Sequence, residues 1–230
     1  MARANLIILS VLLLSIMCVG ISTFYFSDHY LLISFLLVTL SILPFYYRFQ
    51  VRKMDTREIV LIAILSAIAA VSRIPFAPIP NVKPVSFIIM VSAMVFGKEA
   101  GFIIGSTAAL VSNIFFGQGP WTPWQMFAWG MVGFVTGLMK DTKWMTWRLG
   151  QAAYGFVWGF VFDWFMNLSV MINFVKDFQW QALIATYMAG FYFDLAHACS
   201  NALFLYFFGA SWLKILDRFK RKYGLLTQES

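Results

Sequence analysis

The sequence predicts an all-α integral membrane protein with eight transmembrane helices and both termini in the cytosol. Three observations predict this class: 61% of the residues are hydrophobic, only 12% are charged, and the basic residues fall in short gaps between long apolar runs. A soluble domain is about a quarter charged, so this chain has too little polar surface to face water on every side. The net charge of +7 therefore reflects membrane topology and argues against nucleic-acid binding.

Eight apolar runs approach the length of about 20 residues that a helix needs to cross a bilayer. The first is favoured as a retained helix over a cleaved leader, because a second run follows it closely. The fourth is short, so we expect it to be tilted, broken or shielded by its neighbours, and the eighth is expected to begin deeper than its first apolar residue. The runs cover residues 6–26, 31–47, 57–74, 85–96, 100–116, 124–139, 151–175 and 182–208.

The basic residues orient these helices. With the N-terminus inside, fourteen of the 17 Lys and Arg residues fall on the cytosolic side, and only Arg73, Lys83 and Lys176 fall outside. Lys and Arg are enriched in cytoplasmic loops, so this orientation is strongly favoured. The basic segment 48–57 also divides the chain. We expect a two-helix hairpin and basic loop over residues 1–53, a six-helix core over 54–219 and a cytoplasmic tail over 220–230.

Small residues recur four positions apart in four of the core helices. Such spacing removes side chains from one helix face and lets two backbones approach closely. We expect most of these pairs to lie at helix contacts inside the bundle. The first pair lies on the cytoplasmic half of its helix, where a docking face for another membrane subunit is the alternative. The pairs are Ala63/Ala67, Gly101/Gly105, Gly133/Gly137 and Gly155/Gly159.

Two outer loops have unusual compositions. Residues 73–84, RIPFAPIPNVKP, contain four prolines, which predict a stiff, extended loop. Residues 117–125, GQGPWTPWQ, combine Trp121 and Trp124 with the amides Gln118 and Gln125. An interfacial aromatic belt explains the tryptophans alone. The amides and prolines beside them favour a lid over a planar ligand with polar edges.

Polar residues also lie inside the last two predicted helices. Asp163 and Asn167 share one helix face, and Asp194, His197 and Asn201 share a face of the next helix. Ionisable groups at membrane depth are costly, so they normally face a cavity or a partner. A ligand cavity, a neutral structural cluster with Asp194 bonded to His197, and a proton relay are all open interpretations.

Other chemistry finds no support in the sequence. It contains no GxxxxGK[ST], HExxH or GxSxG motif and no Cys/His metal spacing. We therefore expect no enzyme activity, no metal and no intrinsic cofactor.

The six core helices, the proline-rich loop after the first and the small residues on its cytoplasmic half resemble the S components of energy-coupling factor (ECF) vitamin transporters. Residues 112–134 and the loop Asn81-Val82-Lys83-Pro84 are similar to a subgroup of that family, with cobalamin-specific members the most similar. The resemblance covers residues 54–219. It implies a multi-pass subunit of a bacterial cell membrane that binds a vitamin, preferably cobalamin, at an outward-facing cavity.

The resemblance also implies partners. Ala63 and Ala67 match the pattern that docks onto the membrane T component (EcfT), while two cytosolic ATPases (EcfA and EcfA′) supply energy and the S component topples to carry its site inward. Arg73 and Lys83 near the mouth favour an anionic group, such as the phosphodiester of cobalamin. We expect the binding residues to be Asn81, Lys83, Gln118, Trp121, Trp124, Gln125, Asp163, Asn167, Asp194, His197 and Asn201.

Three alternatives stay open at this point. In the first, the chain is an S component whose ligand is queuosine, folate, riboflavin or a thiamine precursor instead of cobalamin. A stand-alone transporter driven by protons through Asp163, Asp194 and His197 is the second alternative. An enzyme acting on a lipid inside the membrane is the third, and it would need a nucleophile or metal set that the sequence does not show.

Overall fold

The computed structural model describes residues 36, 39, 40, 42–44, 46, 47, 55–174 and 179–225. Most of the predicted N-terminal hairpin, Lys176 and the last five residues lie outside this part of the chain. Within it the secondary structure is helical, without strands. The helices are α3 (Thr56–Val71), α4 (Val85–Phe96), α5 (Lys98–Phe116), α6 (Thr122–Met139), the 3-10 helix η1 (Lys143–Thr146), α7 (Arg148–Phe174) and α8 (Trp180–Tyr223).

These helices follow the six predicted core runs closely, with one exception. Helix α8 does not stop near residue 208 but continues to Tyr223. By length and composition α5 and α8 are long and apolar enough to cross a membrane, and α4 is a shorter apolar helix. The all-α class is thus confirmed for the described residues. The total of eight spans and the cytosolic location of both termini stay predictions.

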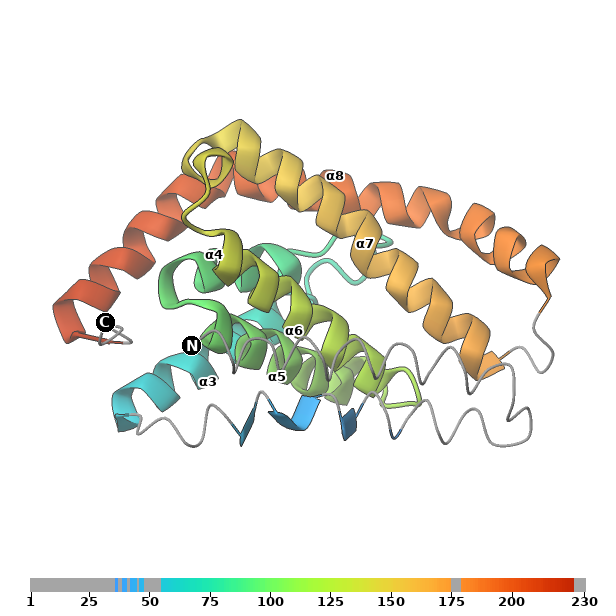
Figure 1. Cartoon of the computed structure of the whole chain (residues 1–230), viewed down its shortest axis with the longest axis horizontal. Helices are drawn as coiled ribbons and strands as arrows, with labels where there is room; N and C mark the ends of the chain where they lie inside the picture. The colour runs from blue at the N-terminus through green and yellow to red at the C-terminus, as the bar shows by residue number, and fades with distance from the viewer. Residues whose placement is uncertain are drawn as a thin grey trace.

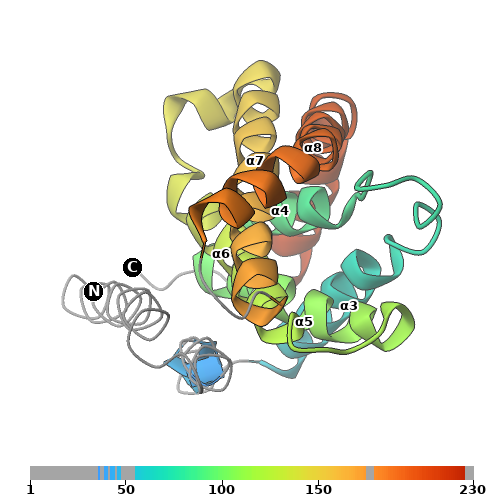
Figure 2. The same ribbon diagram turned by 90° about the vertical axis from the view of Figure 1, so that its right-hand side faces the viewer.

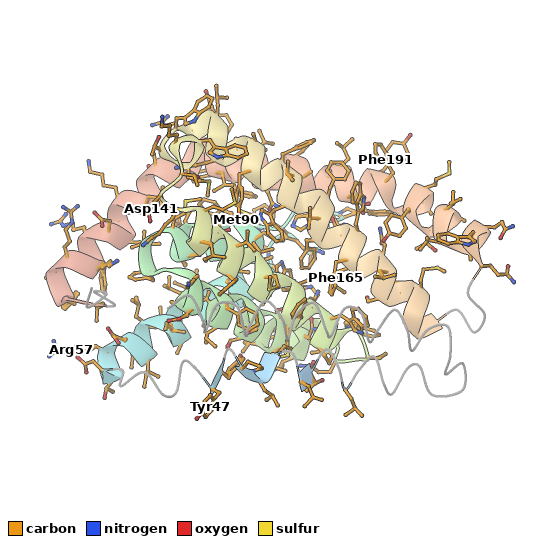
Figure 3. All side chains as sticks on the ribbon, viewed as in Figure 1. Tyr47, Arg57, Met90, Asp141, Phe165 and Phe191 are labelled. Carbon is orange, nitrogen blue, oxygen red and sulfur yellow. The ribbon has the colours of Figure 1, made fainter. Side chains whose placement is uncertain are left out.

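The short helix α4 is shielded by its neighbours. Eleven of its 12 residues are buried, and Met90 lies at the centre of the bundle in Figure 3, whereas Phe191 lies on the outer surface of α8. Because protein surrounds α4, this helix does not have to be long enough to span the lipid by itself. Figure 2 shows α7 and α8 side by side, and Figure 1 shows that α8 bends toward the start of α3.

Glycines allow the closest helix contacts, as the spacing predicted. A Cβ added to Gly133 would lie 2.1 Å from the carbonyl oxygen of Gly101, and one on Gly105 would lie 2.2 Å from that of Trp129. Between α7 and α8, a Cβ on Gly159 would lie 2.4 Å from the Cα of Ala198. The three glycine pairs therefore serve the interior of the bundle. Ala63 and Ala67 are exposed instead.

Both outer loops differ from the sequence prediction. Residues 72–84 form successive turns rather than an extended chain, with the amide of Ile74 donating to the Val71 carbonyl oxygen (3.0 Å) and that of Ile79 to Phe76 (2.9 Å). Proline fixes φ but is equally suited to turns, so proline content alone did not distinguish the two. Helix α6 begins at Thr122 with Pro123 in its first turn. Trp124 and Gln125 are therefore helical and not part of the loop.

Candidate functional site

A chain of buried hydrogen bonds joins four helices at the centre of the bundle. His197 Nδ1 lies 2.9 Å from Asp163 Oδ2, and His197 Nε2 lies 3.0 Å from Ser86 Oγ. The indole nitrogen of Trp129 donates to the same hydroxyl at 3.1 Å. A neutral His197 gives each of these three hydrogen bonds one donor and one acceptor. In that assignment Ser86 donates to His197 Nε2, and the N–H at His197 Nδ1 donates to Asp163. The arrangement binds α4, α6, α7 and α8 together.

This geometry corrects the predicted partner of His197. The histidine bonds to Asp163 across the α7–α8 contact, not to Asp194, its neighbour on α8. Asp194 instead accepts from Asn167 Nδ2 at 3.4 Å, at the long limit of a hydrogen bond. The sequence predicted which residues share a helix face. It did not determine how the two faces are rotated against each other.

Asn201 differs from the other polar residues of α8. Its side chain is completely buried, and neither its amide nitrogen nor its oxygen has a hydrogen-bond partner. A buried polar group without a partner costs about 1–3 kcal/mol, so such a group in a folded protein calls for an explanation. Because Asn201 lies one helical turn beyond His197, its amide is a candidate for direct ligand contact.

The loop after α3 is fastened to α8. Asn81 donates from Nδ2 to the carbonyl oxygen of Phe193 (3.1 Å), and the backbone amide of Lys83 donates to Ser200 Oγ (3.2 Å). The ammonium group of Lys83 donates to Asn81 Oδ1 at 3.0 Å. Asn81 has a φ of 54°, in the left-handed region that asparagine tolerates better than most residues. The loop thus brings Asn81 and Lys83 against the helix that carries Asp194 and His197.

At the start of the same loop, Arg73 is buried between aromatic rings. Its guanidinium lies 4.5 Å from the ring centre of Phe116 and 4.9 Å from that of Trp129. It also donates to Ser112 Oγ and, at 3.2 Å, to Asn113 Oδ1. Stacking on ring faces stabilises a cation, and only 6% of the residue is exposed.

The second outer loop joins this cluster through Asn113. Asn113 Nδ2 donates to Thr122 Oγ1 (3.2 Å), and that hydroxyl donates to Gln118 Oε1 (2.9 Å). Gln118 Nε2 donates to the Leu110 carbonyl oxygen, so both ends of this amide hold the loop itself. Gln118 thus has a structural role that the sequence did not predict.

The two tryptophans of this region have different environments. Trp124 is only 2% exposed and packs against Phe165 of α7 with ring centres 5.4 Å apart. It is a core residue, which an aromatic belt at a membrane surface would not be. Trp121 is half-buried and its indole covers Gly119. Gln125 is half-buried too, and its Oε1 has no hydrogen-bond partner. Trp121 and Gln125 therefore stay candidates for ligand contact.

The structure brings two predicted groups together and adds residues that sequence reasoning missed. Asn81, Lys83, Asp163, His197 and Asp194 are linked through the loop, α7 and α8. The missed members are Ser86, Trp129 and Asn113, which connect these groups to α4, α5 and α6. Asn113 and Trp129 had a signal in the sequence. Each is a polar or indole-bearing residue within a predicted apolar run.

We expect Ser86→Ala to destabilise the protein, because it leaves both Trp129 Nε1 and His197 Nε2 without their partner. Each buried unpaired group costs about 1–3 kcal/mol. The matched control is Ser92→Ala in the same helix, because Ser92 is equally buried and its Oγ has no partner to lose. Thermal unfolding in detergent should show a clearly lower midpoint for the first variant only. Equal midpoints would show that the hydrogen-bond chain does not hold the bundle.

Comparison with known proteins finds one matching family and several relatives that match part of the chain. The family model described as "ECF transporter, substrate-specific component" matches residues 57–215. A UPF0397 protein of Vibrio atlanticus is 30% identical over 89 residues, which are 36% of this chain and 48% of the relative. UPF0397 proteins of Aliivibrio fischeri and Aliivibrio salmonicida are 28% identical over 90 residues, 37% of this chain and 49% of each relative. The match thus spans about half the length of these relatives. No solved structure matches significantly.

Proposed function

The chain belongs to the substrate-specific components of ECF transporters, and from this membership we propose that it binds a vitamin, preferably cobalamin, at an outward-facing site and delivers it to a membrane T component. Members of the family are membrane-embedded transport subunits and not enzymes. They work with T components and ATPase subunits in general. The vitamin and the partners of this chain are part of the proposal.

One observation carries the binding site: buried polar groups of the core helices that have no hydrogen-bond partner. Both amide atoms of Asn201, the Nε1 of Trp124 and the Oε1 of Gln125 have no hydrogen-bond partner. Asn81 and Lys83 belong to the loop that is fastened to α8, the helix of Asn201. Ligand sites combine aromatic and apolar walls with a few polar groups, and these residues supply groups of both kinds.

The docking surface is supported by the one small-residue pair that is not used inside the bundle. Ala63 and Ala67 are exposed on α3, flanked by Val60 and Ile64, each 51% exposed. A face of small residues edged with apolar ones suits close approach of another membrane helix. Beside it lies an apolar groove of about 490 Å³ between α3 and the end of α8. Its lining is Thr56, Arg57, Val60, Leu61, Ile64, Phe219, Tyr223 and Leu225.

Ligand identification tests the proposal most simply. The protein is purified from cells in mild detergent, denatured, and the released small molecule is identified by mass spectrometry and visible absorbance. We expect a vitamin, and a corrinoid spectrum would identify cobalamin. Release of another vitamin would keep the subunit assignment and replace cobalamin. A protein that releases none of these and binds none of them when each is added would contradict the binding role.

A further inference from the structure

Two cations, the buried Arg73 and the half-buried Lys83, belong to the loop that is fastened to α8. Arg73 lies near the start and Lys83 near the end of the loop between α3 and α4. The positive charge of Arg73 contributes to a lower pKa of Lys83. Among the described residues, no carboxylate lies within 4 Å of either side chain. The carboxylates of Asp163 and Asp217 are instead paired with His197 and Arg221. Two like charges held together without a direct counter-charge are unfavourable in a protein interior.

The acidic groups nearby make no direct ion pair with Arg73 or Lys83. Asp163 acts on Lys83 from α7, but its Oδ2 is bound by His197. Asp194 on α8 is bound by Asn167. The pKa of Lys83 is lowered to about 8, first by its burial and then by the charge of Arg73, with Asp163 opposing. Neither carboxylate therefore takes up the donors of Arg73 or Lys83 directly.

Both cations also keep donors that the protein does not use. An ammonium group has three donors and a guanidinium has five. Lys83 Nζ has one acceptor, Asn81 Oδ1, and the Nε of Arg73 is buried without any partner. Arg73 is more than nine-tenths buried, so bulk water does not satisfy that donor. Unused charged donors are what an incoming anion needs.

We propose that Arg73 and Lys83 bind an anionic group, a carboxylate or a phosphate ester, on the transported ligand. The inference rests on the proposed function and narrows its substrate class to molecules that carry such a group. The aromatic rings of Phe116 and Trp129 hold the Arg73 guanidinium in place, and Asn81 positions the Lys83 ammonium. Neither cation then has to reorganise when the anion arrives, which favours affinity.

The test compares a pair of corrinoids. Cyanocobalamin carries a phosphodiester, and dicyanocobinamide lacks the nucleotide loop that contains it. Affinities of both are measured by equilibrium dialysis with visible absorbance, for the wild type, Arg73→Gln, Lys83→Gln and the control Lys143→Gln. Lys143 is exposed and is predicted to lie at the opposite, cytosolic end. We expect the first two variants to bind cyanocobalamin at least about 30-fold more weakly, with cobinamide binding unchanged and the control like wild type.

The outcomes separate the inference from the proposed function. Cyanocobalamin binding that survives both substitutions would overturn the inference and leave the vitamin-binding role intact. If the wild type binds neither corrinoid, the cobalamin assignment fails, and the molecule that copurifies decides the inference. An anionic molecule that is lost from Arg73→Gln supports it, and a neutral or cationic one overturns it.

A pH dependence follows from the same arrangement. Free Lys83 loses its proton near pH 8, whereas a bound anion favours the protonated form. Affinity for cyanocobalamin should therefore fall as the pH rises from 7 to 9. The fall should be absent in Lys83→Gln, because Arg73 stays protonated in this range and His197 and the two aspartates are common to both proteins. An equal fall in that variant would show that another group titrates.

Discussion

Gly133→Val is expected to prevent folding of the bundle. A Cβ at this position would lie 2.1 Å from the carbonyl oxygen of Gly101, and the obstacle is backbone rather than the end of a flexible side chain. Helices α5 and α6 would have to separate along their whole contact. Inserting side chains into a close-packed interior costs about 1–3 kcal/mol even where neighbours adjust, and a backbone contact has less room to adjust.

Size-exclusion chromatography of detergent-solubilised protein measures this effect. We expect the variant to be lost or aggregated. The matched control is Ala67→Val, which adds two methyl groups on the exposed face of α3 and should elute like wild type. A monodisperse Gly133→Val variant with a normal unfolding midpoint would show that the α5–α6 contact is looser than described.

Ala67→Trp is expected to abolish uptake while ligand binding stays intact. The exposed small-residue face of α3 contains none of the predicted binding residues, so we expect a bulky ring there to leave ligand binding intact. It would, however, hold a partner helix away from the α3 backbone, and close approach is what such a face provides. Uptake in cells and binding to purified protein are measured side by side, for this variant and for Ala63→Trp.

The control for that experiment places the same ring on another exposed surface. Val157 on α7 is 58% exposed, so Val157→Trp adds similar bulk away from α3 and should leave uptake unchanged. If Ala67→Trp transports as well as this control, the assignment of the docking face is wrong. Loss of binding in Ala67→Trp would mean that the substitution disturbs the fold.

The sequence predicted the helices better than the contacts between them. Long apolar runs determine where a membrane helix can lie, and glycine spacing indicates which faces approach closely. Residue spacing does not determine how one helix is rotated against the next, which is why the structural-cluster interpretation paired His197 with Asp194, whereas the structure pairs it with Asp163. Ser86 was missed because a single serine in an apolar helix has no distinctive pattern, although it joins Trp129 to His197.

The loops were harder to predict for a different reason. Proline restricts φ in turns and extended segments alike, so the proline-rich segment after α3 was expected to be extended and proved to be a series of turns. Gln118, a predicted binding residue, bonds to Leu110 of α5 and Thr122 of α6, which the sequence did not indicate. The hydrogen-bond partners of loop side chains depend on how the flanking helices are arranged. The sequence contains no periodic pattern that indicates these partners.

The central claim is that this chain is a binding subunit that depends on partners for energy. The most direct test is uptake of the ligand identified by mass spectrometry into proteoliposomes, with the chain alone or together with its T component and ATPases. We predict accumulation only in the complete assembly with ATP, and none in the chain alone under a pH gradient. Uptake by the chain alone, driven by protons and lost in Asp163→Asn, would contradict the account and favour a stand-alone transporter.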